Sequence, residues 1–274
     1  KVGVRKLGLH LVEPLLRHGI GIGRDALFAL LRERGMLIRR RKRKHITTDS
    51  NHPYRKYSNL IRDFIPLKAN ELWVSDITYI ETTEGFLYLS LITDAYSHKI
   101  VGWHLSETLE TRGPLLALNM ALGQRRTKHA LIHHSDRGVQ SCSYDYTNLL
   151  NHPKNKVKIS MTENGDPYEN ALAERVNGIL KGEFLPPVVD LKQQASILIG
   201  QSIKTYNELR LHSSINFMTP QQAHHSEGLL TKKWKPKIRN RHQPSEANVK
   251  PRLPDAQGQA LRVFGKKSPP SCVG

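Results

Sequence analysis

Residues 71–80 are ELWVSDITYI, and this stretch does most to decide which fold the chain can adopt. Its Trp, Val, Ile, Thr and Tyr side chains are the aromatic and β-branched types that favour strands. One carboxylate, Asp76, stands in the middle of the run. Because a charged group in an apolar strand is costly unless it is paired or bound to a cation, Asp76 either faces water on an edge strand or belongs to a site.

Strand signals continue on the C-terminal side of this stretch. Residues 86–93 predict an apolar second strand and residues 100–105 a third, with turn residues between them. Three consecutive strands joined by short turns indicate an antiparallel meander. Two further strands are expected at 130–134 and 157–161.

Helical apolar spacing separates and follows the later strands. Leucine and alanine recur at this spacing in residues 112–125, and further helices are predicted at 144–150, 168–184 and 191–209. The element order is therefore βββαβαβα followed by one more helix. It predicts an α/β fold in which helices flank a five-stranded mixed sheet.

The formal charge of +18 is concentrated in the two flanks of the chain. Residues 1–70 carry 17 Lys or Arg against 5 Asp or Glu, a net +12, and residues 231–274 carry 11 against 2, a net +9. Residues 71–230 carry 14 against 17, a net −3. Concentrated Lys and Arg neutralise phosphates, so this distribution favours a nucleic-acid partner over a merely basic soluble protein.

The N-terminal flank combines helical and basic signals. Residues 1–44 predict two short helices around a Gly-rich turn, which suits part of a helix-turn-helix DNA-binding module. Residues 45–69 are expected to form a linker, and residues 231–274 a basic, disordered tail. The helical segment ends in a basic run, which cannot pack in a core. These residues are expected to contact DNA phosphates: Arg39, Arg40, Arg41, Lys42, Arg43 and Lys44.

Composition also argues against two classes of protein. No run of about 18 apolar residues and no signal peptide is found, so no membrane partner is expected. Cys142 and Cys272 are far apart and lack metal-ligand spacing. Neither a zinc site nor a disulfide framework is therefore expected, and a reducing cytoplasm fits.

Two further carboxylates are candidate partners of the strand aspartate. Asp136 stands just after the strand at 130–134 and before the turn at Gly138, which suits either a site at a strand end or a plain turn. Glu174 lies on a polar helix stripe, which is either functional or a solvated face. The stripe is shared, at helical spacing, by Asn170, Asn177 and Lys181.

Asp76, Asp136 and Glu174 together predict a metal site. Carboxylates from two strands and a helix can converge at one end of a sheet, and an all-oxygen ligand set favours Mg²⁺ or Mn²⁺. Such ions suit phosphoryl transfer. Three other carboxylates, at a turn or off the stripe, are weaker candidates: Asp94, Glu169 and Glu183. Two strand-end histidines, His133 and His134, either orient Asp136 or pack in the core.

Four ordered motifs carry a resemblance to a known family. They are WVSDITYI at 73–80, LITDAYS at 91–97, HSDRG at 134–138 and GDPYENALAE at 165–174. The chain resembles, over about residues 15–230, the OrfB-type transposases of bacterial insertion sequences, which contain a retroviral-integrase-like core domain.

The resemblance implies a ribonuclease-H-like fold for residues 70–230 and a catalytic, metal-binding triad of Asp76, Asp136 and Glu174. It also implies a basic residue two helical turns after the glutamate, where Lys181 stands. Lys181 and its stripe neighbours Asn170 and Asn177 are the expected DNA contacts within this core. The interval 137–173 is two residues longer than is usual in the family, and the loop at 151–156 is expected to absorb the surplus.

The resemblance further implies a DNA transposase that cleaves at transposon ends and transfers a strand into target DNA. Its expected partner is double-stranded DNA, both ends and target, bound by a homo-multimer in the bacterial cytoplasm and nucleoid. Because the chain begins at Lys1 rather than Met, a fragment or a product fused to an upstream reading frame is also expected. The alternatives are a metal-dependent nuclease without strand transfer and a DNA-binding remnant whose catalysis has decayed.

Overall fold

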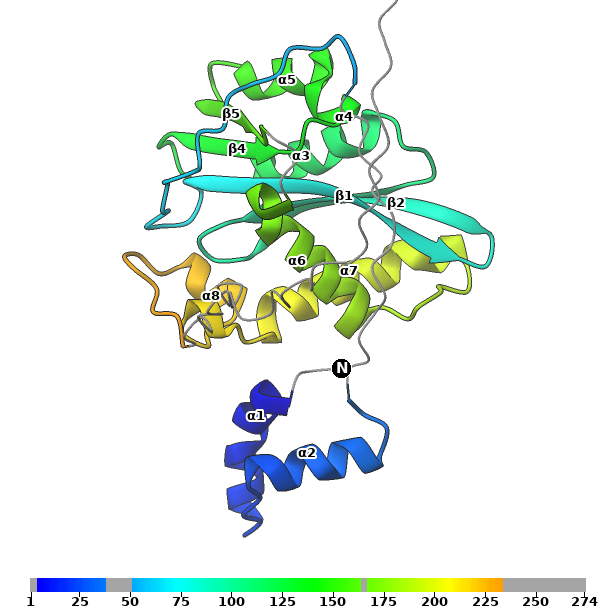
Figure 1. Ribbon diagram of the computed structural model, residues 1–274, viewed down its shortest axis with the longest axis vertical. Coiled ribbons are helices and arrows are strands. Elements are labelled where there is room, and N and C mark those ends of the chain that lie inside the picture. Colours follow the sequence, from blue (N-terminus) through cyan, green and yellow to red (C-terminus); the bar gives the residue numbers. More distant parts are fainter. Residues whose placement is uncertain (1–3, 38–50, 164–166, 234–274) are drawn as a thin grey trace, which may run out of the picture. The chain divides into compact units, whose positions relative to one another are not determined.

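The computed structural model describes residues 4–37, 51–163 and 167–233 (Figure 1). Near the N-terminus, α1 (Val4–Arg17) and α2 (Arg24–Glu33) pack against each other around a turn in which Gly19 has a φ of 68°. This pair agrees with the two short helices predicted there. The basic run at 39–44 lies outside the described residues, as does nearly all of the predicted tail.

One five-stranded mixed sheet organises residues 72–161. Its strands are ordered β3-β2-β1-β4-β5. The first three are antiparallel neighbours, as the predicted meander requires, and the last two join β1 in parallel. The strands are β1 (Leu72–Thr82), β2 (Gly85–Asp94), β3 (Ile100–Ser106), β4 (Leu131–Ser135) and β5 (Val157–Met161).

Helices cover both faces of this sheet (Figure 1). On one face, α3 (Arg112–Gln124), α4 (Val139–Cys142) and α5 (Tyr144–Asn151) contribute buried side chains to a core built around Trp73 and Leu131. On the other face, two helices pack over the β1–β3 side of the sheet. These are α6 (Ala171–Ile179) and α7 (Lys192–Leu209). The predicted α/β fold is confirmed.

The predicted helix at 168–184 is divided into three parts. A 3₁₀ turn, η1 (Pro167–Asn170), leads into α6, and a π-helical turn, η2 (Leu180–Phe184), follows it. The Leu185 amide donates to the Leu180 carbonyl over 3.0 Å, which is the wider i→i+5 bond of a π turn. A short η3 (Ser213–Ile215) and α8 (Pro220–His224) end the described part of the chain.

The described part of the predicted linker, residues 51–69, contains no helix or strand, but it is attached to the sheet. The Leu60 amide donates to Ser160 Oγ over 2.9 Å, and the Met161 amide of β5 donates to the Ser58 carbonyl over 3.4 Å. Tyr54 and Tyr57 pack against the core around Trp73. Across the described ranges, no helix has the length and apolarity needed to cross a membrane.

Candidate active site

Two of the predicted carboxylates occupy corresponding positions on neighbouring parallel strands. The pairing of β1 with β4 ends at Val74 and His134, and Asp76 and Asp136 each stand two residues further on. Because side chains alternate along a strand and neighbouring strands lie about 4.8 Å apart, this register carries both aspartates to one side of the sheet. The adjacent parallel strands therefore bring together residues that are far apart in the sequence.

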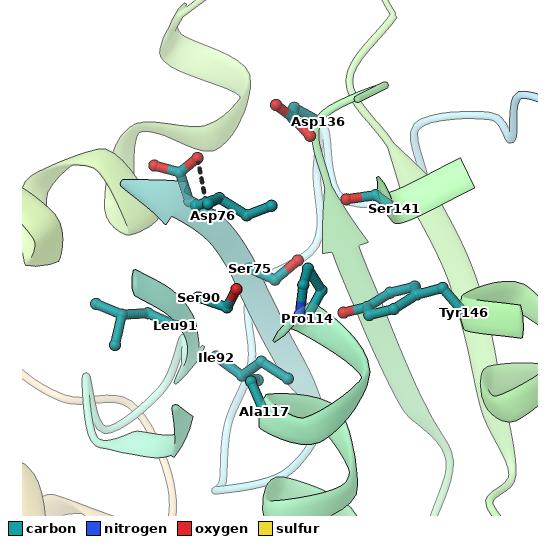
Figure 2. Close-up of a pocket in the computed structure, with 11 residues that line it drawn as sticks. Ser75, Asp76, Ser90, Leu91, Ile92, Pro114, Ala117, Asp136, Ser141 and Tyr146 are labelled. Atoms are coloured by element: carbon teal, nitrogen blue, oxygen red, sulfur yellow. Dashed lines mark hydrogen bonds between the residues drawn. The ribbon is translucent and has the colours of Figure 1, made fainter. Parts of the chain in front are cut away.

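Asp76 and Asp136 line the same hollow of about 280 Å³, part of which is open solvent. Figure 2 shows their carboxyl groups at one end of it, with Asp76 on β1 and Asp136 beyond the end of β4. Apolar side chains line part of the rest of the hollow. The other lining residues carry hydroxyl groups: Ser75, Ser90, Ser141 and Tyr146. Asp136 Oδ1 also accepts a hydrogen bond from the Gly138 amide over 3.1 Å, which fixes the turn after β4.

The Asp76 carboxylate is half-buried beside like charges. Burial, and then the negative charge of Asp136, raise its pKa to about 7, and Glu174 adds to the rise. Two hydrogen bonds oppose this rise in pKa. Asp76 Oδ1 accepts from the Ile77 amide over 2.9 Å, and Oδ2 accepts from Asn177 Nδ2 over 2.6 Å. The site therefore holds more negative charge than its own donors compensate, which favours a bound cation.

The polar stripe predicted on the helix faces β1. Asn170 Nδ2 donates to the Ser75 carbonyl over 2.9 Å, Asn177 to Asp76, and Lys181 Nζ to Thr78 Oγ1 over 2.6 Å. Asn170 and Asn177 are only 7% and 5% exposed, and their amide groups hold β1, whereas their contact with DNA stays a prediction. Sequence reasoning found the stripe but missed this positioning role.

Along the stripe, Glu174 and Lys181 stand on either side of the buried Asn177 amide. Glu174 lies in the first turn of α6, is exposed, and is near enough to Asp76 to raise the pKa of that carboxyl group. Lys181, in the π turn, is half-buried, and its ammonium group lies 4.9 Å from the centre of the Tyr79 ring. The α6–η2 segment thus brings one acidic and one basic side chain to the strand that carries Asp76.

A divalent cation fits the donor chemistry of this edge. Asp76 and Asp136 supply carboxylate oxygens to one hollow, and the raised pKa of Asp76 is the electrostatic response that a nearby cation reverses. Within the described ranges, no three His, Cys, Asp or Glu side chains are already arranged to enclose an ion. Two predicted ligands therefore line one hollow, and the third, Glu174, stands in the first turn of α6 and acts electrostatically on Asp76.

The weaker candidates have other partners. Asp94 is fully buried and accepts from the Asn70 and Ser97 amides over 2.6 and 2.8 Å. Glu169 accepts from the Glu163 amide over 2.6 Å, and Glu183 pairs with Arg210, the residue that follows α7.

The two strand-end histidines are fully buried. His133 Nε2 is 3.0 Å from Tyr146 Oη, and His134 Nδ1 is 2.8 Å from Ser160 Oγ. Burial lowers the pKa of His133 to about 3 and that of His134 to about 4, so both are neutral at pH 7. Neutral buried rings fit a packing role behind Asp136.

Comparison with known proteins identifies the family to which this chain belongs. Models described as integrase core domain match residues 66–167 and 155–220. The 31 kDa protein of insertion element IS600 from Shigella sonnei is 37% identical over 80% of this chain and 79% of its own length. The chain belongs to the IS3 family of insertion-sequence transposases. The predicted resemblance is thereby confirmed, and integrase cores of such transposases form a polynucleotidyl transferase family.

Other family members show similar coverage. The transposase for insertion sequence element IS629 of Shigella sonnei is 33% identical over 81% of this chain and 73% of its own length. Among solved structures, the catalytic core domain of HTLV-2 integrase in complex with magnesium has a TM-score of 0.43 and 19% identity, covering 59% of this chain and 100% of that domain. The family models and the sheet order identify the core of this IS3-family chain as an integrase-like, ribonuclease-H-like fold.

Proposed function

We propose that this chain is the DNA transposase of its insertion sequence, which cuts DNA at the ends of the element and joins the freed strands to target DNA. The observation that carries the proposal is the placement of Asp76 and Asp136 at equivalent register on β1 and β4, lining one hollow. Family membership supports the reaction class, and the two carboxylates support the assignment of the reaction to this hollow.

Asp76, Asp136 and Glu174 would hold Mg²⁺ or Mn²⁺. When bound, such ions would reduce the charge on the scissile phosphate and favour ionisation of the attacking oxygen. The acidity of the edge supports this assignment, because the pKa of Asp76 is raised to about 7 by burial and by Asp136. Asn177 would keep Oδ2 of Asp76 in place through its 2.6 Å hydrogen bond.

The proposed reaction has two phosphoryl-transfer steps. In the first, the oxygen of water bonds to the phosphorus at the end of the element, and the P–O3′ bond breaks to leave a 3′-hydroxyl and a 5′-phosphate. In the second, that 3′-hydroxyl bonds to a target phosphorus, and the target's O3′ leaves as a hydroxyl. No covalent enzyme intermediate is required, so the protein contributes position and charge.

The proposed partners are double-stranded DNA at the element ends and at the target. Because two ends must meet, a homo-multimer on DNA is expected, and a fusion with the product of an upstream reading frame remains part of the proposal. The basic run Arg39–Lys44 and Lys181 would contact phosphates. Asn170 and Asn177 would hold β1 in position through their hydrogen bonds to Ser75 and Asp76.

The test is a Mg²⁺-dependent assay on labelled oligonucleotides that carry the ends of the encoding element. We expect shortened strands and joined products from the wild type. We expect neither from Asp76→Asn, Asp136→Asn or Glu174→Gln, each of which should still bind the DNA. Glu208→Gln, an exposed carboxylate on α7, is the matched control and should keep full activity.

Each alternative predicts a different outcome of this assay. Shortened strands without joined products would indicate a nuclease that lacks strand transfer. DNA binding with no cleavage, together with no calorimetric Mg²⁺ binding that depends on Asp136, would indicate a decayed remnant. Full activity in any of the three carboxylate variants would remove that residue from the proposed triad.

A further inference from the structure

Residues 51–62, here called the basic strap, are held beside the candidate site. The strap contains three basic residues and no acidic one. His52 Nε2 lies 2.8 Å from the Arg137 carbonyl, one residue from Asp136, and at the other end the Leu60 amide donates to Ser160 Oγ. Because both ends are fixed, little ordering entropy is lost when a ligand binds the middle of the strap.

Aromatic rings connect the strap to α5. His52 and Tyr54 have ring centroids 5.4 Å apart, and Tyr54 meets Tyr144 edge-to-face, also at 5.4 Å. Tyr54 packs against the core, whereas Tyr144 is 70% exposed at the start of α5. The Tyr144 ring is therefore exposed to solvent and is held on one side by Tyr54.

Basic side chains accompany these rings. Arg55 and Lys56 are exposed between the two fixed ends of the strap, and Arg55 lies over the Tyr57 ring at 4.9 Å. Burial raises the pKa of Cys142 to about 11; Asp136 adds to the rise, and Lys56 and Arg137 oppose it. These charges all act on Cys142, the last residue of α4, so Lys56 and Arg137 lie in the same neighbourhood as Asp136.

We propose that the basic strap and Tyr144 bind an unpaired DNA strand next to the catalytic carboxylates. One base stacks on the Tyr144 ring, and Arg55 and Lys56 contact the phosphates on either side. Stacking on an aromatic side chain needs an exposed base face, which an unpaired strand offers and the interior of a duplex does not. The inference deepens the proposed function, because cutting and joining strand ends requires such a strand beside Asp136.

The test measures binding without catalysis. The full chain is titrated, in EDTA, into a single-stranded oligonucleotide with 2-aminopurine at its end, and in parallel into a blunt duplex of the same sequence. For Tyr144→Ala we expect about 5- to 100-fold weaker single-strand binding, which is the usual range for loss of one stacked base. Tyr144→Trp should restore binding, and duplex binding should change less than about 2-fold for either variant.

Charge and aromatic controls separate the strap from the basic flanks. Arg55→Ala and Lys56→Ala should each lower the salt slope of single-strand binding by about 0.7. Lys204→Ala, an exposed lysine on α7, should leave the slope unchanged, and Phe86→Ala, which removes a ring 51% exposed on β2, should leave stacking unchanged.

Three outcomes would overturn the proposal: wild-type single-strand binding by Tyr144→Ala, no recovery with Tyr144→Trp, or an equal loss on the duplex. The wild-type cleavage assay is run separately. Failure of cleavage with intact Tyr144-dependent binding would count against the transposase assignment alone. Intact cleavage with Tyr144-independent binding would count against the strap alone.

Discussion

Two groups of charged side chains meet the α6–η2 segment, and they differ in how their charges are compensated. At the candidate site, Asp76 lies near two like charges and its pKa rises to about 7. At the π turn, Glu183 Oε1 and Oε2 accept from Arg210 Nη2 and Nε, both over 2.7 Å. These two side chains are 12% and 4% exposed, so the pair is nearly withdrawn from water.

The comparison indicates which group serves stability and which serves chemistry. Opposite charges in bidentate contact offset the cost of burial, so the Glu183–Arg210 pair fixes the π turn to the end of α7. Like charges held together raise the free energy of the folded protein until a cation or a proton arrives. The acidic edge should therefore lose activity and keep stability when a charge is removed, and the π turn should do the reverse.

The largest expected effect is on catalysis at the acidic edge. Asp136→Asn removes a proposed ligand, and we expect strand cleavage in Mg²⁺ to fall about 10⁴-fold, equivalent to about 5.5 kcal/mol of transition-state stabilisation. The same change removes a like charge beside Asp76, so the free energy of unfolding in EDTA at pH 8 should not decrease. Urea denaturation beside the cleavage assay checks both, and a variant that cleaves normally or unfolds more readily contradicts the contrast.

The second prediction concerns the π turn. Glu183→Gln leaves the Arg210 guanidinium buried without its counter-charge, so we expect a loss of about 3–5 kcal/mol in the free energy of unfolding. The double variant Glu183→Leu with Arg210→Met removes both charges and should recover most of that loss. Urea denaturation of Glu183→Leu, of Arg210→Met and of the double variant gives the coupling energy. Additive losses would show that the pair does not act as a unit.

Local signals explain how much of this was predictable from sequence. The five strands are runs of β-branched and aromatic residues bounded by turns, and each lies within about two residues of its predicted range. Asp76 was identifiable because a carboxylate interrupts such a run. The split of helix 168–184 was not predictable, because the Glu183–Arg210 contact joins residues 27 positions apart and leaves no local pattern.

The asparagines of the stripe show a different limit. Helical spacing correctly grouped Asn170, Asn177 and Lys181 on one face, but spacing does not reveal what that face meets. A polar face usually meets water or a ligand, which led to their interpretation as DNA contacts. Here the face meets β1, whose Ser75 carbonyl and Asp76 carboxylate accept from the two amides.

The third prediction is a pH dependence that arises from Asp76. Its pKa is about 7 in the folded chain against 3.8 for an ordinary aspartate, so between these values the folded state binds a proton that the unfolded state has released. Stability contributed by this proton is complete below pH 3.8 and is lost as pH rises through 7. Allowing for relaxation of a partly open site, we expect wild type to lose about 1–2 kcal/mol more than Asp76→Asn between pH 4 and 8 in EDTA.

Thermal or urea unfolding across this pH range measures the difference between the two proteins. Titration of the groups that do not interact with Asp76 is common to both proteins, so it cancels in the subtraction. In Mg²⁺ the difference at pH 8 should shrink or reverse, because a bound cation replaces the proton. If the free energies of unfolding of the two proteins change in parallel with pH in EDTA, the pKa of Asp76 is not raised in the folded chain.

The smallest expected effect belongs to Lys181, which stands between the two groups. Its ammonium group donates to Thr78 Oγ1 over 2.6 Å and lies 4.9 Å from the centre of the Tyr79 ring, so it keeps its full charge but is restrained from moving toward a phosphate. We expect Lys181→Met to weaken DNA binding about 3- to 10-fold and to lower the salt slope by about one, with little loss of stability. Lys181→Arg should keep the slope because it keeps the charge.

Thr78→Val is the matched control for this lysine. It removes the hydroxyl acceptor on β1 and leaves the ammonium charge, so it should not lower the salt slope. Fluorescence anisotropy of labelled duplex at several salt concentrations measures all three variants. If Lys181→Met keeps the wild-type slope, the lysine only braces β1 and has the same structural role as Asn170 and Asn177. If Thr78→Val lowers the slope as much as Lys181→Met, the position of the ammonium group matters as much as its charge.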